Sequence, residues 1–119
     1  MSNISVGRLG EDKAAEYLRS LGYTILCRNF RTRLGELDIV AEKNNIITFC
    51  EVKTRVGDAK GKPYEAVDQR KLSHLQKACQ LYLLKNNIKS AKLSLQVISI
   101  ELYNDLTIKQ IQMFEVISR

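Results

Sequence analysis

The chain has 119 residues, of which 45% are hydrophobic and 27% charged, and its formal net charge is +6. This length suits one folded domain, so we expect a single domain over residues 1–119. The composition excludes a disordered chain, the apolar runs are too short to cross a membrane, and no apolar signal segment begins the sequence. We therefore expect a cytoplasmic protein without a membrane partner.

The chain begins with a helical pattern. A helix is expected over residues 5–21, closed by Gly22 as its C-cap. Its apolar stripe is formed by residues at helical spacing, namely Ala14, Ala15, Leu18 and Leu21.

Three strands are predicted next. The first runs from about residue 23 to residue 30. Two more, over residues 36–42 and 46–53, lie on either side of a turn at Asn44 and Asn45. A two-residue turn of this kind is typical of a β-hairpin, so these two strands are expected to be antiparallel neighbours.

The second half of the chain predicts one long helix and two strands. The helix is expected over residues 64–87, and the strands over 93–103 and 107–115, joined by a turn at Asn104 and Asp105. The inner side of the helix is expected to carry Val67, Leu75, Ala78, Cys79, Tyr82 and Leu83. The order αβββαββ predicts an α/β fold, bordering on α+β, in which helices flank a mixed central sheet.

Neither the cysteines nor the single histidine indicates a reactive site. Cys27, Cys50 and Cys79 are odd in number, and no CxxC or Cys/His cluster occurs. We expect free thiols in or beside the core rather than a disulfide framework or a zinc site. His74 falls among polar residues in the middle of a helix, so we expect a histidine at the surface.

The hairpin brings two acidic residues together. Counting outward from the turn places Asp38 opposite Glu51, and Glu36 opposite Lys53 on the same face. Directly opposed Cβ atoms lie roughly 4.5–5.5 Å apart, and two carboxylates so close repel unless a proton or a cation lies between them. Mg²⁺ or Mn²⁺, which prefer hard oxygen ligands, would remove that repulsion.

Two cross-strand ion pairs on a solvated face are the alternative explanation, since such pairs are common and individually weak. A slip of one residue in register would also move Asp38 out of line with Glu51. Two features favour a metal. The flanking segments LDIVA and ITFCEV are strongly apolar, and an ion pair would place opposite charges together rather than Asp against Glu.

A third carboxylate, Glu11, falls on the apolar face of the first helix, four residues before Ala15 and seven before Leu18. It is therefore expected to point toward the core or its rim. Gly7 and Gly10 share part of that face, and their small size would let another backbone or a phosphate approach. The alternative is a glutamate favoured near the helix N-terminus by the helix dipole, and spacing does not decide between the two.

A resemblance to a known family runs through most of the chain. Two segments of the chain resemble the YraN-like family of small bacterial proteins, and the remainder resembles it more loosely. The two segments are GRLGEDKAAEYLRSLGYTILCRNFRTRLGELDIVAEKNNIITFCEVKTR and AVDQRKLSHLQKACQLYL. That family is similar in fold to archaeal Holliday-junction resolvases and to restriction-endonuclease-like nucleases, which carry a PD-(D/E)xK metal site. The resemblance therefore implies a restriction-endonuclease-like fold with a nuclease site.

The resemblance also assigns residues to that site by position. Asp38 matches the motif aspartate, and Glu51 and Lys53 match the ExK pair. Glu11 matches the helix-borne glutamate of the resolvases, and Glu36, in GELD, is a family residue without an assigned role. All five are candidate catalytic residues.

In such a site one or two ions of Mg²⁺ or Mn²⁺ would be bound by Asp38, Glu51 and the backbone carbonyl of Val52, with Glu11 holding a second ion or a water beside it. Lys53 would orient or deprotonate the attacking water and stabilise the charge that develops on the phosphate.

Basic residues flank the acidic pair in the sequence, with Arg28, Arg31 and Arg33 before it and Arg55, Lys60 and Lys62 after it. The estimated pI of 9.3 suits a polyanionic partner. We expect these side chains to contact phosphates without reading bases. The alternative is a solvated charged rim that aids solubility.

These expectations describe a metal-dependent endonuclease that hydrolyses the phosphodiester bonds of DNA, with branched DNA such as a Holliday junction as a candidate substrate. Symmetric cuts in a junction need two sites, so a homodimer is expected. RNA is an alternative substrate, because nothing in the sequence separates it from DNA. The alternative function is a non-catalytic module on a nuclease fold that binds nucleic acid or another partner, since fold does not imply function.

Overall fold

Seven elements make up the described part of the chain. The computed structural model describes residues 5–57 and 68–118, with side chains described as far as residue 116. The elements are α1 (Val6–Ser20), β1 (Thr24–Arg31), β2 (Glu36–Lys43), β3 (Ile46–Val56), α2 (Gln69–Lys85), β4 (Lys92–Leu102) and β5 (Ile108–Ser118). The predicted order αβββαββ is confirmed.

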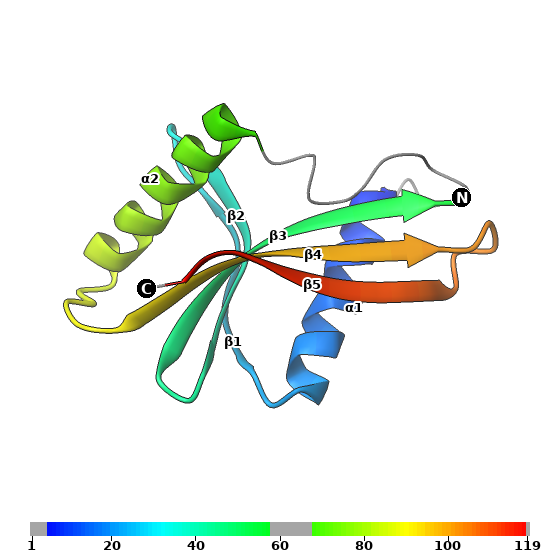
Figure 1. Ribbon diagram of the computed structural model, residues 1–119, viewed down its shortest axis with the longest axis horizontal. Coiled ribbons are helices and arrows are strands. Elements are labelled where there is room, and N and C mark those ends of the chain that lie inside the picture. Colours follow the sequence, from blue (N-terminus) through cyan, green and yellow to red (C-terminus); the bar gives the residue numbers. More distant parts are fainter. Residues whose placement is uncertain (1–4, 58–67, 119) are drawn as a thin grey trace.

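The described strands form one five-stranded sheet in the order β1-β2-β3-β4-β5. Strands β3 and β4 are parallel and the other neighbours are antiparallel, so the sheet is mixed, as predicted. Helix α1 packs mainly over β3, whereas α2 lies over β1 and β2 (Figure 1). The helices thus flank the sheet in the α/β or α+β arrangement that the sequence predicts.

The core has two parts, one under each helix. The part under α1 contains Ala14, Ala15, Leu18, Ile39, Ala41, Cys50, Ile98, Ile100 and Leu102. The part under α2 contains Leu37, Val40, Ile47, Phe49, Leu75, Ala78, Cys79, Tyr82 and Leu95. Tyr82 makes edge-to-face ring contacts with Phe30 and Phe49. Burial of these apolar side chains holds each helix to its own face of the sheet.

Some predicted boundaries differ from the structure. Leu21 is the C-cap of α1 and is 39% exposed, so it does not belong to the buried stripe. Helix α2 begins at Gln69, and residues 64–67, with the expected inner residue Val67, lie outside the described residues. Strand β3 continues three residues past its predicted end to Val56, because it pairs with β4 over its whole length.

The hairpin register follows the prediction as far as the ladder extends. Asn44 and Asn45 both have positive φ angles, 53° and 63°, as a tight two-residue turn requires. The ladder between β2 and β3 ends at the pair Ile39 and Cys50. Beyond that pair, β2 stays with β1 and β3 stays with β4, so the two strands part.

The predicted pairing of Glu36 with Lys53 is therefore wrong. The ladder partner of Glu36 is Arg31 of β1, and that of Lys53 is Ser99 of β4. Counting from the turn assumed that β2 and β3 stay neighbours along their whole length. In the structure β2 also pairs with β1, and β3 also pairs with β4, and these pairings continue where β2 and β3 separate.

Two expectations about the whole chain can also be compared with the structure. Cys50 and Cys79 are buried, Cys27 is half-buried, and all three thiols are free, as predicted. In the described ranges, neither helix has the length and apolar character needed to cross a membrane.

Helix α1 approaches β3 closely at Gly10. A Cβ atom added there would clash with Oγ1 of Thr54 and lie 2.7 Å from its Cβ, so the group that approaches is a side chain and not the expected backbone or phosphate. At Gly7 the nearest atom to an added Cβ is Oγ of Ser5, at an ordinary 3.8 Å, so the same expectation is not met there.

We expect Gly10→Ala to lower the free energy of unfolding by about 1–3 kcal/mol, because α1 must move away from the sheet. Gly7→Ala makes the same change on the same helix in open space, so it should be neutral or stabilise by up to about 1 kcal/mol. Urea denaturation of both variants measures the difference. Equal effects of the two substitutions would contradict the packing described.

Candidate functional site

A surface pocket of about 450 Å³ lies where β2 and β3 part. It is lined by Gly35, Glu36, Asp38, Glu51, Asp68, Arg70, Lys71, His74 and Leu75. Strands β2 and β3 contribute Glu36, Asp38 and Glu51, the N-cap of α2 contributes Asp68, and the first turns of α2 contribute the basic residues. The pocket therefore joins segments from both halves of the sequence.

Asp38 is held at the point where the ladder stops. The N–H of Val52 donates a hydrogen bond to Oδ2 of Asp38 at 2.7 Å, so a side chain takes the place of a strand as the acceptor. The carboxyl group also lies within hydrogen-bonding reach of the Glu51 carboxyl. The predicted meeting of these two carboxylates is thus present, although it is made past the end of the ladder.

Burial, with the hydrogen bond to Glu51 and the charge of Glu51, raises the pKa of Asp38 to about 8, and the Val52 N–H acts in the opposite direction. Asp38 therefore keeps its proton at neutral pH when no cation is bound.

Glu51 is almost wholly buried, with 11% of its side chain exposed. Its Oε2 lies 3.2 Å from Nζ of Lys71 on α2. The alternative of cross-strand ion pairs on a solvated face does not describe this residue, because Glu51 is buried and its cation comes from a helix. The ion pair with Lys71 offsets part of the cost of burying the carboxylate.

Glu11 faces a neighbouring groove of about 610 Å³, which also contains Arg8, Arg28, Arg31 and Glu36. An Arg28 guanidinium nitrogen lies 3.7 Å from Glu11 and 2.7 Å from Asp12. Burial raises the pKa of Glu11, while Arg28 acts in the opposite direction. Glu36 lines both this groove and the pocket of Asp38, so the two recesses adjoin.

Residues 5–57 and 68–116 contain no group of three or more His, Cys, Asp or Glu side chains arranged to hold a metal ion. They do contain a smaller donor set of two carboxyl groups, Asp38 and Glu51. The N–H and C=O of one strand residue point to the same side, so the carbonyl of Val52 faces the opening with its N–H. Three oxygen donors of this kind fit Mg²⁺ or Mn²⁺, which complete their coordination with water or substrate oxygens.

The predicted basic residues occupy different places. Arg28 and Arg31 line the groove of Glu11, and Arg31 also pairs with Glu36 at 3.6 Å. Arg33 is exposed and Arg55 is half-buried. Lys60 and Lys62 lie outside the described residues.

Lys53 is half-buried on β3 and does not line the pocket of its neighbour Glu51. Within the described ranges it forms no ion pair. The lysine that contacts Glu51 is therefore not the one that the ExK pattern indicates.

The basic side chains of α2 were missed from the sequence. Lys71 falls four residues before Leu75 and seven before Ala78, so it lies on the buried face of α2. A lysine on an apolar stripe was the available signal. His74 is exposed, as predicted, but it lines the pocket with the carboxylates, which the sequence did not indicate.

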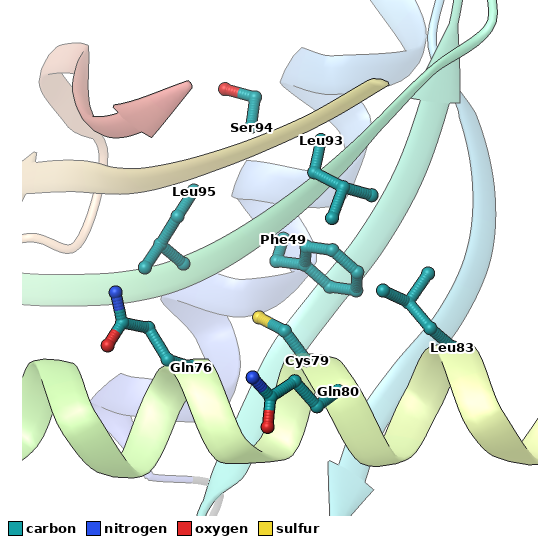
Figure 2. Close-up of a pocket in the computed structure, with 8 residues that line it drawn as sticks. All are labelled: Phe49, Gln76, Cys79, Gln80, Leu83, Leu93, Ser94 and Leu95. Carbon is teal, nitrogen blue, oxygen red and sulfur yellow. The ribbon is translucent and has the colours of Figure 1, made fainter. Parts of the chain in front are cut away.

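A second pocket between α2 and the strands β3 and β4 has a different character (Figure 2). Its walls are Phe49, Gln76, Cys79, Gln80, Leu83, Leu93, Ser94 and Leu95, which include no charged group. Burial raises the pKa of the Cys79 thiol to about 12, so this cysteine is not poised as a nucleophile. The chemistry that the described residues can perform lies instead with Asp38 and Glu51.

The raised pKa of Asp38 has a consequence for stability. Between about pH 4 and pH 8 the unfolded chain has released the proton that the folded chain keeps, so the free energy of unfolding falls as the pH rises. Asp38→Asn keeps both hydrogen bonds but cannot ionise. Without divalent ions, we expect its stability relative to wild type to rise with pH across this range, by at most about 1.4 kcal/mol per pH unit.

Urea denaturation at pH 5, 7 and 9 measures this trend, with Glu16→Gln, an exposed carboxylate on α1, as the matched control. A difference between Asp38→Asn and wild type that stays constant across the three pH values would contradict the raised pKa of Asp38.

Comparison with known proteins identifies the family. Residues 10–118 match "Uncharacterised protein family UPF0102". A UPF0102 protein of Persephonella marina is 47% identical over 103 residues, covering 87% of this chain and 89% of the relative. One from Syntrophomonas wolfei is 50% identical over 98 residues, covering 82% and 85%, and one from Clostridium botulinum is 49% identical over 86 residues, covering 72% and 70%. This chain therefore belongs to the UPF0102 family, the YraN-like family that its motifs resemble.

Proposed function

We propose that this protein is a metal-dependent endonuclease that hydrolyses phosphodiester bonds of DNA, with branched DNA such as a four-way junction as its substrate. The observation that carries the proposal is the meeting of the Asp38 and Glu51 carboxyl groups in a surface pocket. A buried and a half-buried carboxyl group in contact are costly to the fold, and a divalent cation is the ligand that their charge and oxygen chemistry favour.

Hydrolysis of a phosphodiester joins a water oxygen to phosphorus and breaks one bond between phosphorus and an ester oxygen. One water proton goes to the leaving oxygen and the other to solvent, which leaves a phosphate monoester and a free hydroxyl. Mg²⁺ or Mn²⁺ held by Asp38, Glu51 and the Val52 carbonyl would supply positive charge to the phosphate oxygens and acidify a water.

The residues of the chain supply position and charge for this reaction. The Val52 N–H fixes Asp38, and Lys71 fixes Glu51, so the two carboxylates are held before substrate arrives. Lys53, two residues after Glu51, would orient the attacking water. A second ion would use Glu11 with Glu36, whose charges already influence each other across the neighbouring groove.

The adjoining groove supplies cations for the substrate backbone. Arg8, Arg28 and Arg31 line it, and phosphate contacts by arginine give affinity without base specificity. Arg33, Arg55, Lys60 and Lys62 would extend these contacts. Symmetric cleavage of a junction needs two sites, so the active unit would be a homodimer.

The principal test combines calorimetric titration with Mn²⁺ and incubation with a labelled four-way DNA junction. We expect wild type to bind Mn²⁺ and cut the junction. Asp38→Asn and Glu51→Gln should lose metal binding and lower the cleavage rate by at least about a hundredfold, because each removes a charged ligand. Lys53→Ala should retain metal binding but lose cleavage.

Glu16→Gln, an exposed carboxylate away from both recesses, is the control and should behave as wild type. A linear duplex and an RNA junction of the same sequence separate branched DNA from other substrates. Junction binding by wild type with neither Mn²⁺ uptake nor cutting would reject the proposal in favour of a non-catalytic binding module. Full cleavage by Asp38→Asn would reject the assigned site.

A further inference from the structure

We propose that Lys71 is a further catalytic residue of this site, which pairs with Glu51 in the free protein and binds an oxygen of the scissile phosphate in the substrate complex. The inference rests on the proposed nuclease function. It adds a charge from α2 to the one that the ExK pattern places on β3.

The first argument is position. Lys71 is the lysine whose Nζ lies 3.2 Å from Glu51, and both residues line the pocket that contains Asp38. An ammonium group beside one carboxylate of the pair is close to any phosphate that an ion on that pair would bind. Lys53 does not line this pocket.

The second argument is that the backbone carrying Lys71 is fixed. Asp68 is the N-cap of α2, and its Oδ1 accepts a hydrogen bond from the N–H of Lys71 at 2.8 Å. Gly35, in the loop before β2, packs so closely that a Cβ there would lie 2.5 Å from the carbonyl oxygen of His74. The first turns of α2 are therefore held against the loop that leads to Asp38.

The third argument is charge placement. The first turn of α2 contains no acidic residue, and Arg70 and Lys71 both line the pocket there. Cations at a helix N-terminus oppose the helix dipole and reduce stability. Glu51 offsets one of these charges. An anion in the pocket would offset the charge of Arg70, and a phosphodiester is the anion that the proposed reaction supplies.

The fourth argument is mobility of the charge. The side chain of Lys71 is 36% exposed, and its ammonium is carried on a flexible four-carbon stem. When Glu51 instead serves as a ligand of a divalent cation, repulsion between the two cations favours movement of Nζ away from Glu51. The phosphate oxygens in the same pocket then become its partner.

Lys71→Met tests this exchange, because it keeps most of the stem and removes the charge. In single-turnover cleavage of the junction we expect its rate to fall about ten- to a hundredfold. Calorimetry should show the opposite effect on Mn²⁺, with a Kd about two- to fivefold lower than that of wild type, because the competing ammonium is gone. Lys71→Arg should recover part of the cleavage rate.

Lys77→Met is the matched control, since Lys77 is an exposed residue of the same helix outside the pocket, and it should leave both measurements unchanged. Thermal unfolding monitors folding, and Lys71→Gln replaces Lys71→Met in the same assays if the latter does not fold. Wild-type cleavage and unchanged Mn²⁺ affinity in both neutral variants would overturn the role of Lys71. A wild-type protein that neither binds Mn²⁺ nor cuts would instead reject the proposed function itself.

Discussion

Strands β2 and β3 pair as far as Ile39 and Cys50 and then part, and the candidate site depends on that separation. If the ladder continued, the N–H of Val52 would be paired with backbone and Asp38 would have no special role. Because the strands part, the Asp38 carboxylate accepts that hydrogen bond and a pocket forms beside Glu51. The cause is competition between neighbours, since β2 continues along β1 while β3 continues in parallel with β4.

The separation of β2 and β3 places two carboxyl groups where they add little to the stability of the fold. Asp38 keeps its proton and Glu51 depends on a lysine from α2, so each carboxyl group of the pair needs a compensating partner. Apolar residues of similar size would avoid both costs. A local arrangement that reduces stability is more often found where a protein binds or reacts than where it only folds. This reasoning favours a ligand for the pair over a purely structural role.

The sequence was sufficient to predict the helices and strands, because the spacing of hydrophobic residues indicates them. It was also sufficient to predict the meeting of Asp38 with Glu51, because the turn at two asparagines places these residues opposite each other. It was insufficient where the folded chain departs from the regular alternation of side chains between the two faces of a strand. Asn29 adopts a φ of 55° within β1, and Cys27 and Phe30 both pack against the core under α2. Period-two counting assigns these residues to opposite faces.

Lys71 shows the same limit for the site. Its place on the buried face of α2 follows from helical spacing, but its contact with Glu51 depends on how α2 docks over β1 and β2. The ExK pattern indicates a lysine by its distance along one strand. Among the described residues, the lysine paired with Glu51 comes from another element, because packing rather than sequence distance decides which charges meet.

The two adjoining recesses combine acidic and basic side chains. The pocket and the groove together contain Glu11, Asp12, Glu36, Asp38, Glu51 and Asp68, which would repel a phosphate backbone. Arg28 and Arg31 are already engaged by acidic side chains of the groove. Under the proposed function, a nucleic acid would have to compete with these carboxylates for the two arginines, and exchange of partners, of the kind inferred for Lys71, would make their charge available to a phosphate. The positive charge around the site would thus first hold the acidic residues in place and, once a cation occupied the carboxylates, would then hold the proposed substrate.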